Sequence, residues 1–245
     1  MSYNSFACVY DKLMSDCDYA ARAEYLLGLF DRFSKRPKLM LDLACGTGTL
    51  SVELAKKGID IIAVDSSAEM LGIAKEKANT ENADILLLCQ DAAELDLYGT
   101  IDGAVCTLDS VNHITDIDKL SSVFKKVSLF LEKDCLFIFD VNSEYKHREI
   151  LADNTFVIEE DNVYCVWQNF ADLPMTHINL DFFIEQEDGS YLRESESFSE
   201  RAYSDAQLTK LCLDAGLEVV GIFDDMTYKQ ASECSERKVF VVRKK

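Results

Sequence analysis

The stretch LDLACGTG, residues 41–48, limits the fold of this chain more than any other feature. An apolar run ends in a turn with glycine at positions 46 and 48, and the amphipathic segment TLSVELAKKG follows directly. A buried strand that enters a helix through a glycine turn begins a β–α–β unit, whose ligand lies beside the turn. The sequence therefore predicts a parallel sheet with a ligand site at residues 44–48.

The rest of the first 140 residues repeats this alternation of strand and helix. Continuous apolar runs predict strands over 39–43, 59–65, 84–91, 102–108 and 135–141. Helical spacing of apolar residues predicts helices over 18–33, 49–58, 66–80 and 118–131. Right-handed crossovers between parallel strands give an α/β, doubly wound, mostly parallel sheet with helices on both faces.

A different pattern begins near residue 155. Residues 162–172, 175–186 and 190–203 alternate with period two, and EDGS at 187–190 is a hairpin signal. A helix at 204–216 and strands at 217–225 and 238–245 then resume the first pattern. We therefore expect a main domain of residues 1–150 and 203–245, and an inserted antiparallel β-meander at 151–202. The aromatic-rich insertion is expected to cover an acceptor site or to form a homodimer face; otherwise the chain is a monomer.

Composition narrows the class of partner. A net charge of −19 disfavours nucleic acid, because the two short basic stretches at 32–38 and 241–245 read as solvated edges. The nine cysteines show no CxxC pair and no zinc spacing, so we expect reduced thiols and no metal. Neither a signal peptide nor a membrane-spanning run is found, which favours the cytoplasm. The acidic composition and the lack of a basic groove favour a small-molecule or protein acceptor over nucleic acid.

Three ligands compete for the glycine turn. A phosphate loop requires a lysine after its last glycine, and this turn has none. A dinucleotide turn, GxGxxG, requires a third glycine where Ser51 stands, which weakens a nicotinamide oxidoreductase interpretation. The turn is similar to the acidic-x-G-x-G-x-G turn of S-adenosylmethionine-dependent methyltransferases, with Asp42 leading and Ala44 in the first glycine slot.

Acidic residues at successive strand ends suit an adenosyl ligand. Asp65, at the end of the second strand, is placed to accept hydrogen bonds from both ribose hydroxyls, as it would be for a dinucleotide. Asp91, at the end of the third, can accept from an exocyclic adenine amine, while the N–H of Ala92 donates to the ring.

Over most of its length the chain resembles the class I S-adenosylmethionine-dependent methyltransferases, in particular small bacterial proteins with LDLACGTG and a later DSxN. The matching segments include VDSSAEML, CQDAAEL, CTLDSVNHI, IFDVNS and the FxERxY that ends the meander. The resemblance implies a Rossmann-like seven-stranded sheet with an antiparallel last strand. LEKDC at 131–135 departs from the Pro-Gly-Gly turn of such relatives, so the geometry of that turn is open.

The resemblance also implies the residues that hold S-adenosyl-L-methionine, with Tyr10 covering the methionine end. The expected cofactor contacts are Tyr10, Asp42, Ala44, Cys45, Gly46, Thr47, Gly48, Asp65, Ser66, Met70, Gln90, Asp91, Ala92, Leu108 and Asp109.

Candidates for the chemistry of methyl transfer follow the fourth strand. His113 is the candidate general base, and Asp109 or Asn112 would bind an acceptor amine or orient the cofactor. Trp167 and Arg201 are the substrate-binding candidates of the insertion, Arg201 for an acidic acceptor. We expect a methyltransferase of class EC 2.1.1.- acting on an unidentified acceptor. The alternatives are a non-catalytic S-adenosylmethionine-binding regulator and a nicotinamide-dependent oxidoreductase.

Overall fold

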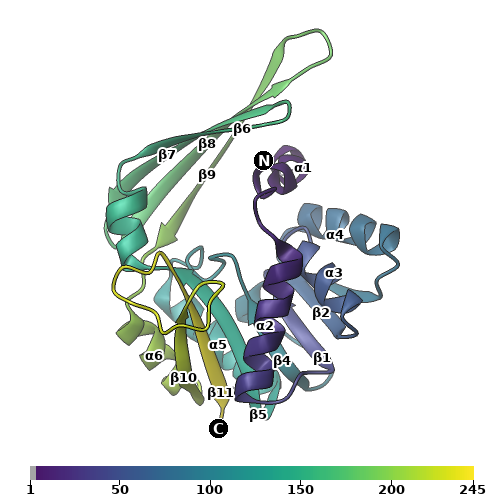
Figure 1. The fold of residues 1–245 in the computed structure, drawn as a ribbon, viewed down its shortest axis with the longest axis vertical. Coiled ribbons are helices and arrows are strands. Elements are labelled where there is room, and N and C mark those ends of the chain that lie inside the picture. The colour runs from purple at the N-terminus through teal and green to yellow at the C-terminus, as the bar shows by residue number, and fades with distance from the viewer. Residues whose placement is uncertain (1–3) are drawn as a thin grey trace.

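The larger of the two sheets has seven strands and carries helices on both faces (Figure 1). The computed structural model describes residues 4–245, with side chains from Val9 onward. The strand order is β10-β11-β5-β4-β1-β2-β3, and β11 runs antiparallel to the other six. The bounds are β1 (Leu39–Leu43), β2 (Asp60–Asp65), β3 (Ile85–Cys89), β4 (Ile101–Cys106), β5 (Leu131–Asn142), β10 (Leu217–Asp224) and β11 (Arg237–Lys244). The predicted doubly wound fold is confirmed.

Successive side chains of the central strands point to opposite faces of the sheet and belong to two separate hydrophobic cores. Leu136 and Ile138 of β5 pack with α2 and α3, whereas Phe137 and Phe139 pack with α5 and α6 on the opposite face. The helices are α2 (Tyr19–Phe33), α3 (Thr49–Lys56), α4 (Ala68–Thr80), α5 (Ile117–Phe130) and α6 (Asp205–Asp214). Because both faces are buried, the strands read as continuous apolar runs.

Several predicted helix starts are confirmed by their caps. Ser67 accepts a hydrogen bond from the Met70 N–H, and Ser204 forms a capping box with Gln207 at the start of α6. The sequence was less informative about 131–135, where β5 begins at Leu131. Asp134 there adopts φ +64°, a conformation that favours glycine, so an aspartate performs the turn in which relatives use glycine.

A second, antiparallel sheet has the strand order β6-β7-β8-β9. Its strands are β6 (Thr155–Glu160), β7 (Val163–Asp172), β8 (Met175–Glu185) and β9 (Tyr191–Arg201). The three predicted strands are confirmed, while β6 and the short helix at Lys146–Leu151 were not predicted. In Figure 1 this sheet rises away from the main sheet, and α1 (Asn4–Leu13) lies between it and α4, in contact with both. Among the described residues, no helix has the length and apolarity to cross a membrane.

Gly48 begins α3 at a position where a side chain has neither the conformation nor the space that it needs. Its φ is +72°, and an ideal Cβ would lie 2.7 Å from the Ala74 Cβ of α4. Gly46, with φ +54°, has no protein atom within 4 Å of its ideal Cβ. Both glycines therefore need a positive φ, but only at Gly48 would a Cβ also collide with a neighbouring side chain.

We expect Gly48→Ala to lower the free energy of unfolding by about 3 kcal/mol, from left-handed strain and overpacking together. Gly46→Ala, the matched control, should lose only about 1 kcal/mol, from backbone strain. Urea denaturation without ligand measures both, and equal losses would contradict the contact between α3 and α4.

Candidate functional site

The carboxyl ends of the parallel strands open into a cavity of about 960 Å³ that continues beneath the second sheet. The turns after β1 to β4 line one side, and another is closed by Tyr10 and Leu13 of α1 and by Met14 directly after it. The second sheet supplies the remaining wall: Ile158, Trp167, Leu180, Glu196, Phe198 and Glu200. Small-molecule sites span about 300–1,000 Å³, so this cavity has room for two ligands side by side.

The turn after β1 presents bare backbone to the cavity. Gly46 lines it without a side chain, and its N–H donates to Asp65 Oδ2 over 2.9 Å. Ala44 adopts φ +57° although it is not glycine, which costs about 1 kcal/mol. Such strain at the end of a buried strand is typical of ligand sites.

A smaller cavity of about 40 Å³ lies against the same turn, lined by Asp42, Cys45, Thr47 and the rings of Tyr10 and Tyr19 among others. Asp42 is buried and accepts a hydrogen bond from Ser51 over 2.5 Å. Burial raises the pKa of Asp42 to about 7, and the charge of Asp65 adds to this effect. A cationic group beside Asp42 would offset the cost of its ionisation.

Asp65 ties the glycine turn to the start of α4. While Oδ2 accepts from Gly46, Oδ1 accepts from the Ser67 N–H over 2.8 Å. Each carboxylate oxygen has a second lone pair, so Asp65 can still accept two hydrogen bonds from a ligand. The side chain lines the large cavity, with Ser66 and Met70 beside it.

At the end of β3, Asp91 has a partner that the sequence did not reveal. Its Oδ1 accepts from the Ala93 N–H over 2.9 Å, and its Oδ2 accepts from Lys119 Nζ over 2.7 Å. The hydrogen bond from Lys119 lowers the pKa of Asp91. Gln90 also lines the cavity, but its amide bonds to the backbone of Asp96 and therefore shapes the turn.

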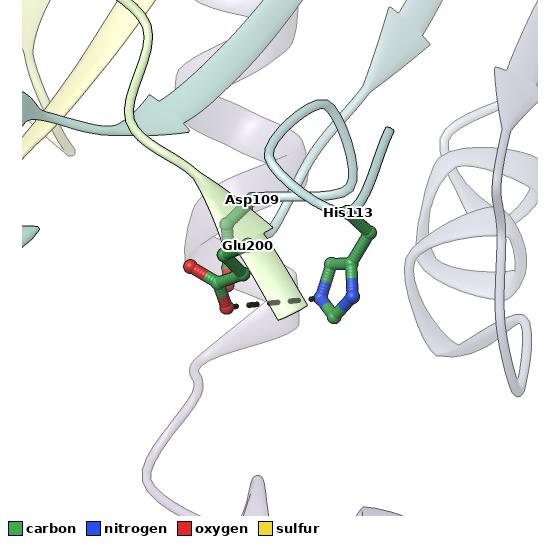
Figure 2. Close-up of side chains that lie close together, drawn as sticks. All are labelled: Asp109, His113 and Glu200. Atoms are coloured by element: carbon green, nitrogen blue, oxygen red, sulfur yellow. Dashed lines mark ion pairs between the residues drawn. The ribbon is translucent and has the colours of Figure 1, made fainter. Parts of the chain in front are cut away.

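Three ionisable side chains meet where the cavity passes under the second sheet (Figure 2). His113 Nε2 lies 3.8 Å from Glu200 Oε1, and one ligand atom from each of Asp109, His113 and Glu200 lies within 4.8 Å of the others. Such a set is chemically capable of holding a cation. The His113 side chain is 43% exposed, whereas Glu200 is 2% exposed.

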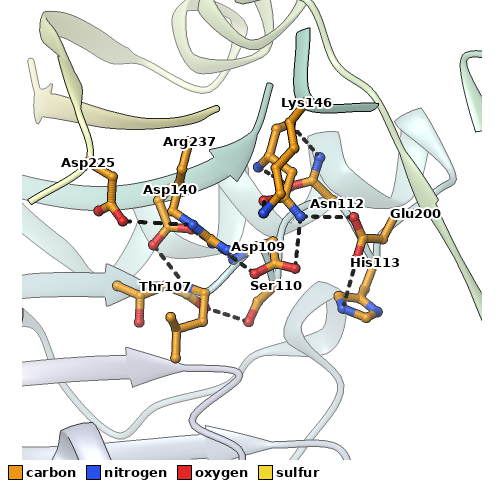
Figure 3. Close-up of polar contacts among 12 residues, drawn as sticks. Thr107, Asp109, Ser110, Asn112, His113, Asp140, Lys146, Glu200, Asp225 and Arg237 are labelled. Atoms are coloured by element: carbon orange, nitrogen blue, oxygen red, sulfur yellow. Dashed lines mark hydrogen bonds and ion pairs between the residues drawn. The ribbon is translucent and has the colours of Figure 1, made fainter. Parts of the chain in front are cut away.

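Hydrogen bonds hold the two carboxylates of this cluster together (Figure 3). Asn142 Nδ2, at the end of β5, donates to Asp109 Oδ2 and to Glu200 Oε2, each over 3.0 Å. Arg237 Nη1 lies 2.8 Å from Asp109 Oδ1. Burial opposes ionisation of Asp109, but the charges of Arg237, His113 and Lys146 outweigh it and lower its pKa.

Glu200 is in the opposite situation. Burial, followed by the charge of Asp109, raises its pKa from an ordinary value of 4.5 to about 8. The neighbouring His147 is fully buried, and burial lowers its pKa to about 4. At neutral pH the structure therefore favours a protonated Glu200 beside an ionised Asp109 and a neutral His147.

The raised pKa of Glu200 predicts that the stability of the protein depends on pH. Because the folded protein binds a proton at Glu200 that the unfolded chain releases near pH 4.5, the contribution of Glu200 to the free energy of unfolding should fall as the pH rises from about 5 to about 8. His147 and His113, whose pKa values are lowered by burial, contribute in the opposite direction below about pH 6.5, so the fall in the total should be clearest between about pH 6.5 and 8. Glu200→Gln should flatten this slope. The raised pKa of Asp42 acts in the same direction and leaves a residual slope in both proteins. Denaturation of the ligand-free protein at several pH values measures it, and parallel profiles would refute the raised pKa of Glu200.

The structure brings together most of the residues that the sequence singled out. Lining the large cavity are Tyr10, Ala44, Gly46, Asp65, Ser66, Met70, Gln90, Asp91, Ala92, Leu108, Asp109, His113 and Trp167. Asp42, Cys45 and Thr47 line the small cavity. Gly48 lines neither and serves as the N-cap of α3.

Asn112 and Arg201 lie outside both linings. Asn112 is fully buried, and its amide bonds to the backbone of Asn142 and Arg201, so it fastens β9 to β5. Arg201 Nη1 donates to the Thr115 carbonyl. These contacts give both side chains a structural position, and we do not propose either as an acceptor ligand.

Sequence reasoning missed Glu200, although it lies in the quoted FxERxY segment. The missing signal was the period of two along β9: Phe198 and Glu200 share the face toward the cavity, and Arg201 has the opposite parity. The other missed residues of the lining are Lys119, Asn142, Lys146, Glu196 and Arg237. Of these, Lys119 and Arg237 pair with carboxylates on distant parts of the chain, Asp91 and Asp109.

Comparisons with known proteins agree with this geometry. A family model described as a methyltransferase domain matches residues 40–134. A protein of Geobacillus sp. (strain WCH70), named as a methyltransferase, is 33% identical over the whole length of both chains. A similarly named protein of Bacillus subtilis (strain 168) is 31% identical over 100% of this chain and 98% of its own.

Solved structures agree as well. The crystal structure of an S-adenosylmethionine-dependent methyltransferase from Clostridium acetobutylicum ATCC 824 has a TM-score of 0.89 and 34% identity, covering 99% of this chain and 98% of that one. An amino pentose methyltransferase of Micromonospora echinaspora, with S-adenosylmethionine bound, shares the fold at a TM-score of 0.79 and 14% identity, covering 100% of this chain and 98% of that one. The chain belongs to the class I S-adenosylmethionine-dependent methyltransferases, and its cofactor is S-adenosylmethionine.

Proposed function

We propose that this protein catalyses methyl transfer from S-adenosylmethionine to a small molecule bound in the same cavity. The observation that carries the proposal is the continuity of the cavity, which runs from the strand ends to the inner face of the second sheet. Residues 1–150 and 203–245 then form the cofactor-binding domain. The insertion, residues 151–202, acts as the roof of the acceptor site, because its inner face is part of the lining.

The residues at the strand ends fit this cofactor. Asp65 has acceptor capacity for the ribose hydroxyls, and Asp91 with the Ala92 N–H is placed for adenine. The small cavity beside Asp42 and the bare backbone at Gly46 suit the amino-acid end, with Tyr10 above it. Ser51 weakens the dinucleotide alternative, because its hydroxyl donates to Asp42 at the position where that turn has its third glycine.

The sulfonium supplies an activated methyl group, so the protein mainly has to position the acceptor and exclude water. The cavity has apolar walls, formed by Leu13 at the end of α1, by Met14 directly after it, and by Trp167, Leu180 and Phe198 of the second sheet. Asp109, His113 and Glu200 are the polar groups on the acceptor side. We therefore place the acceptor beside this cluster and beneath the roof.

A paired thermal-shift assay tests the proposal. S-adenosylmethionine and S-adenosylhomocysteine should raise the melting temperature in a concentration-dependent manner, and NAD should not. An acceptor panel with labelled methyl donor then separates an enzyme from a regulator. Stabilisation by NAD alone would refute the cofactor assignment, and binding without turnover over a broad panel would favour the regulator.

A further inference from the structure

The acceptor end of the cavity contains a carboxyl group without a permanent counter-charge. Among the residues that the structure describes, no lysine or arginine nitrogen lies within 4.0 Å of the Glu200 carboxylate. Its ion-pair neighbours are His113 at 3.8 Å and His147 at 3.6 Å, and burial lowers the pKa of both imidazoles. Glu200 therefore ionises readily only when a cation enters from the cavity.

Asp109 does not share this property. Arg237 occupies its Oδ1 and Asn142 its Oδ2, so both oxygens already have strong donors. Lys146 is also committed, since its Nζ donates to Asn142 Oδ1 over 3.0 Å, and burial followed by the charge of Arg237 lowers its pKa. The position left for a ligand cation is the side of Glu200 that faces the cavity.

Apart from Glu196, the face of the second sheet that carries Glu200 lines the cavity with apolar and aromatic side chains. The Trp167 indole N–H donates to Asn169 Oδ1 over 2.7 Å, so the indole has no donor left for a ligand. The rings of His113 and Phe198 lie 4.8 Å apart, and Ile158 and Leu180 line the same region. Aromatic faces attract ammonium groups and bury hydrocarbon, whereas they give an anion no hydrogen-bond donor.

A divalent metal ion is the competing occupant, because Asp109, His113 and Glu200 are close enough to ligate one. The guanidinium of Arg237, 2.8 Å from Asp109, opposes a dication there. An acidic acceptor is disfavoured by Glu196 and Glu200, both in the lining. These contacts favour an organic monocation over a divalent metal ion and over an acidic acceptor.

We propose that the methyl acceptor is a primary or secondary amine on an apolar body, and that Glu200 binds its ammonium form and takes up its proton. This inference rests on the proposed function. An N–H bond of the ammonium breaks, and the proton moves to a Glu200 oxygen. The nitrogen lone pair then forms the N–C bond as the C–S bond of the donor breaks, leaving S-adenosylhomocysteine as a neutral thioether. The positive charge passes from sulfur to nitrogen, and Glu200 is left protonated, which is its state in the free protein; the one proton of each turnover reaches the buffer when the next ammonium binds and ionises Glu200.

Binding and proton release are linked in this arrangement. Entry of the cation ionises a Glu200 that is protonated in the free protein, so binding near pH 7 should release close to one proton to the buffer. The charged and titratable groups around Glu200 are Asp109 and His113 after β4, Lys146 and His147 after β5, Glu196 on β9 and Arg237 on β11. Glu200→Gln keeps an acceptor for Asn142 and a donor toward Asp109, so it mimics the protonated state without the ability to ionise.

Three probes with one apolar body and different head groups test the proposal: 2-phenylethylamine, 2-phenylethanol and phenylacetate. Calorimetry on the protein loaded with S-adenosylhomocysteine should show the amine binding at least about tenfold more tightly than the other two. Titrations in buffers of different ionisation enthalpy give the number of protons released. Glu200→Gln should weaken the amine at least about tenfold, abolish proton release and leave 2-phenylethanol unchanged.

Glu194→Gln is the matched control, because it removes one charge from the same strand outside the cavity lining. It should bind the amine as the unmodified protein does. Equal affinity for the three probes, equal weakening of amine and alcohol by Glu200→Gln, or binding of none of the probes would overturn the amine assignment. So would an absolute requirement for Mg²⁺ or Mn²⁺. Failure of S-adenosylhomocysteine to bind would instead refute the proposed function, which keeps the two failures distinguishable.

Discussion

Asp65→Ala should lower the affinity for S-adenosylmethionine by at least about 100-fold, or about 2.7 kcal/mol. In the proposed binding mode the variant would lose two charge-assisted hydrogen bonds to the ribose, each worth about 1.5–3 kcal/mol. It also leaves the Gly46 and Ser67 N–H groups without their carboxylate, which loosens the turn that faces the amino-acid end of the cofactor. Isothermal titration with S-adenosylmethionine measures the loss directly.

Asp60→Ala is the matched control for this experiment. Asp60 begins the same strand that Asp65 ends, and it is exposed at the opposite edge of the sheet. Its replacement should leave the affinity unchanged, and the ligand-free unfolding curve of each variant checks that the fold persists. Unchanged affinity in Asp65→Ala would show that the ribose assignment is wrong.

The main sheet was predictable because its signals are local. Each strand is buried on both faces and reads as an apolar run, and helices such as α4 and α6 carry their own caps, Ser67 and Ser204. The strand β6 was missed although TFVI is rich in strand-forming residues and follows Asp153 and Asn154; only its burial alternates, with Thr155, Val157 and Glu159 exposed. A short edge strand depends on its partner, β7, for its identity.

The residues on the two sides of the cavity also differ in how far local sequence signals predict them. Asp65 and Asp91 follow their strands directly, so topology alone brings them to one edge. The acceptor side is assembled from residues far apart in sequence, such as Asp109 and Glu200, which Asn142 joins. Their shifted pKa values depend on burial and on Arg237, which no local pattern reveals.

Asp140→Ala should lower the free energy of unfolding by about 3–5 kcal/mol, because it removes one partner from a buried ion-pair network. Asp140, near the end of β5, is 1% exposed and accepts from the N–H groups of Leu108 and Asp109, each over 2.8 Å. Its Oδ1 also accepts from Arg237 Nη1 over 2.6 Å. Leu108 and Asp109 have φ values of +57° and +55°, so this carboxylate holds a strained segment that lines the cavity on both the cofactor and the acceptor side.

The matched control is Asp225→Ala, which removes a carboxylate from the same network without touching the Leu108–Asp109 backbone. Asp225 is 21% exposed and pairs with Arg22 through two hydrogen bonds of 3.1 and 2.9 Å. Asp225→Ala should lower the free energy of unfolding by about 1–2 kcal/mol, since water can replace part of the hydrogen bonding that Asp225 gives Arg22. Chemical denaturation measures both variants. If Asp225→Ala proves as damaging as Asp140→Ala, the deeper burial of Asp140 and its hydrogen bonds to the Leu108 and Asp109 amides add nothing to stability. A larger loss in Asp140→Ala is the expected sum of its buried pair with Arg237 and of those amide bonds, which fix the turn after β4 and the position of Asp109 beside Glu200.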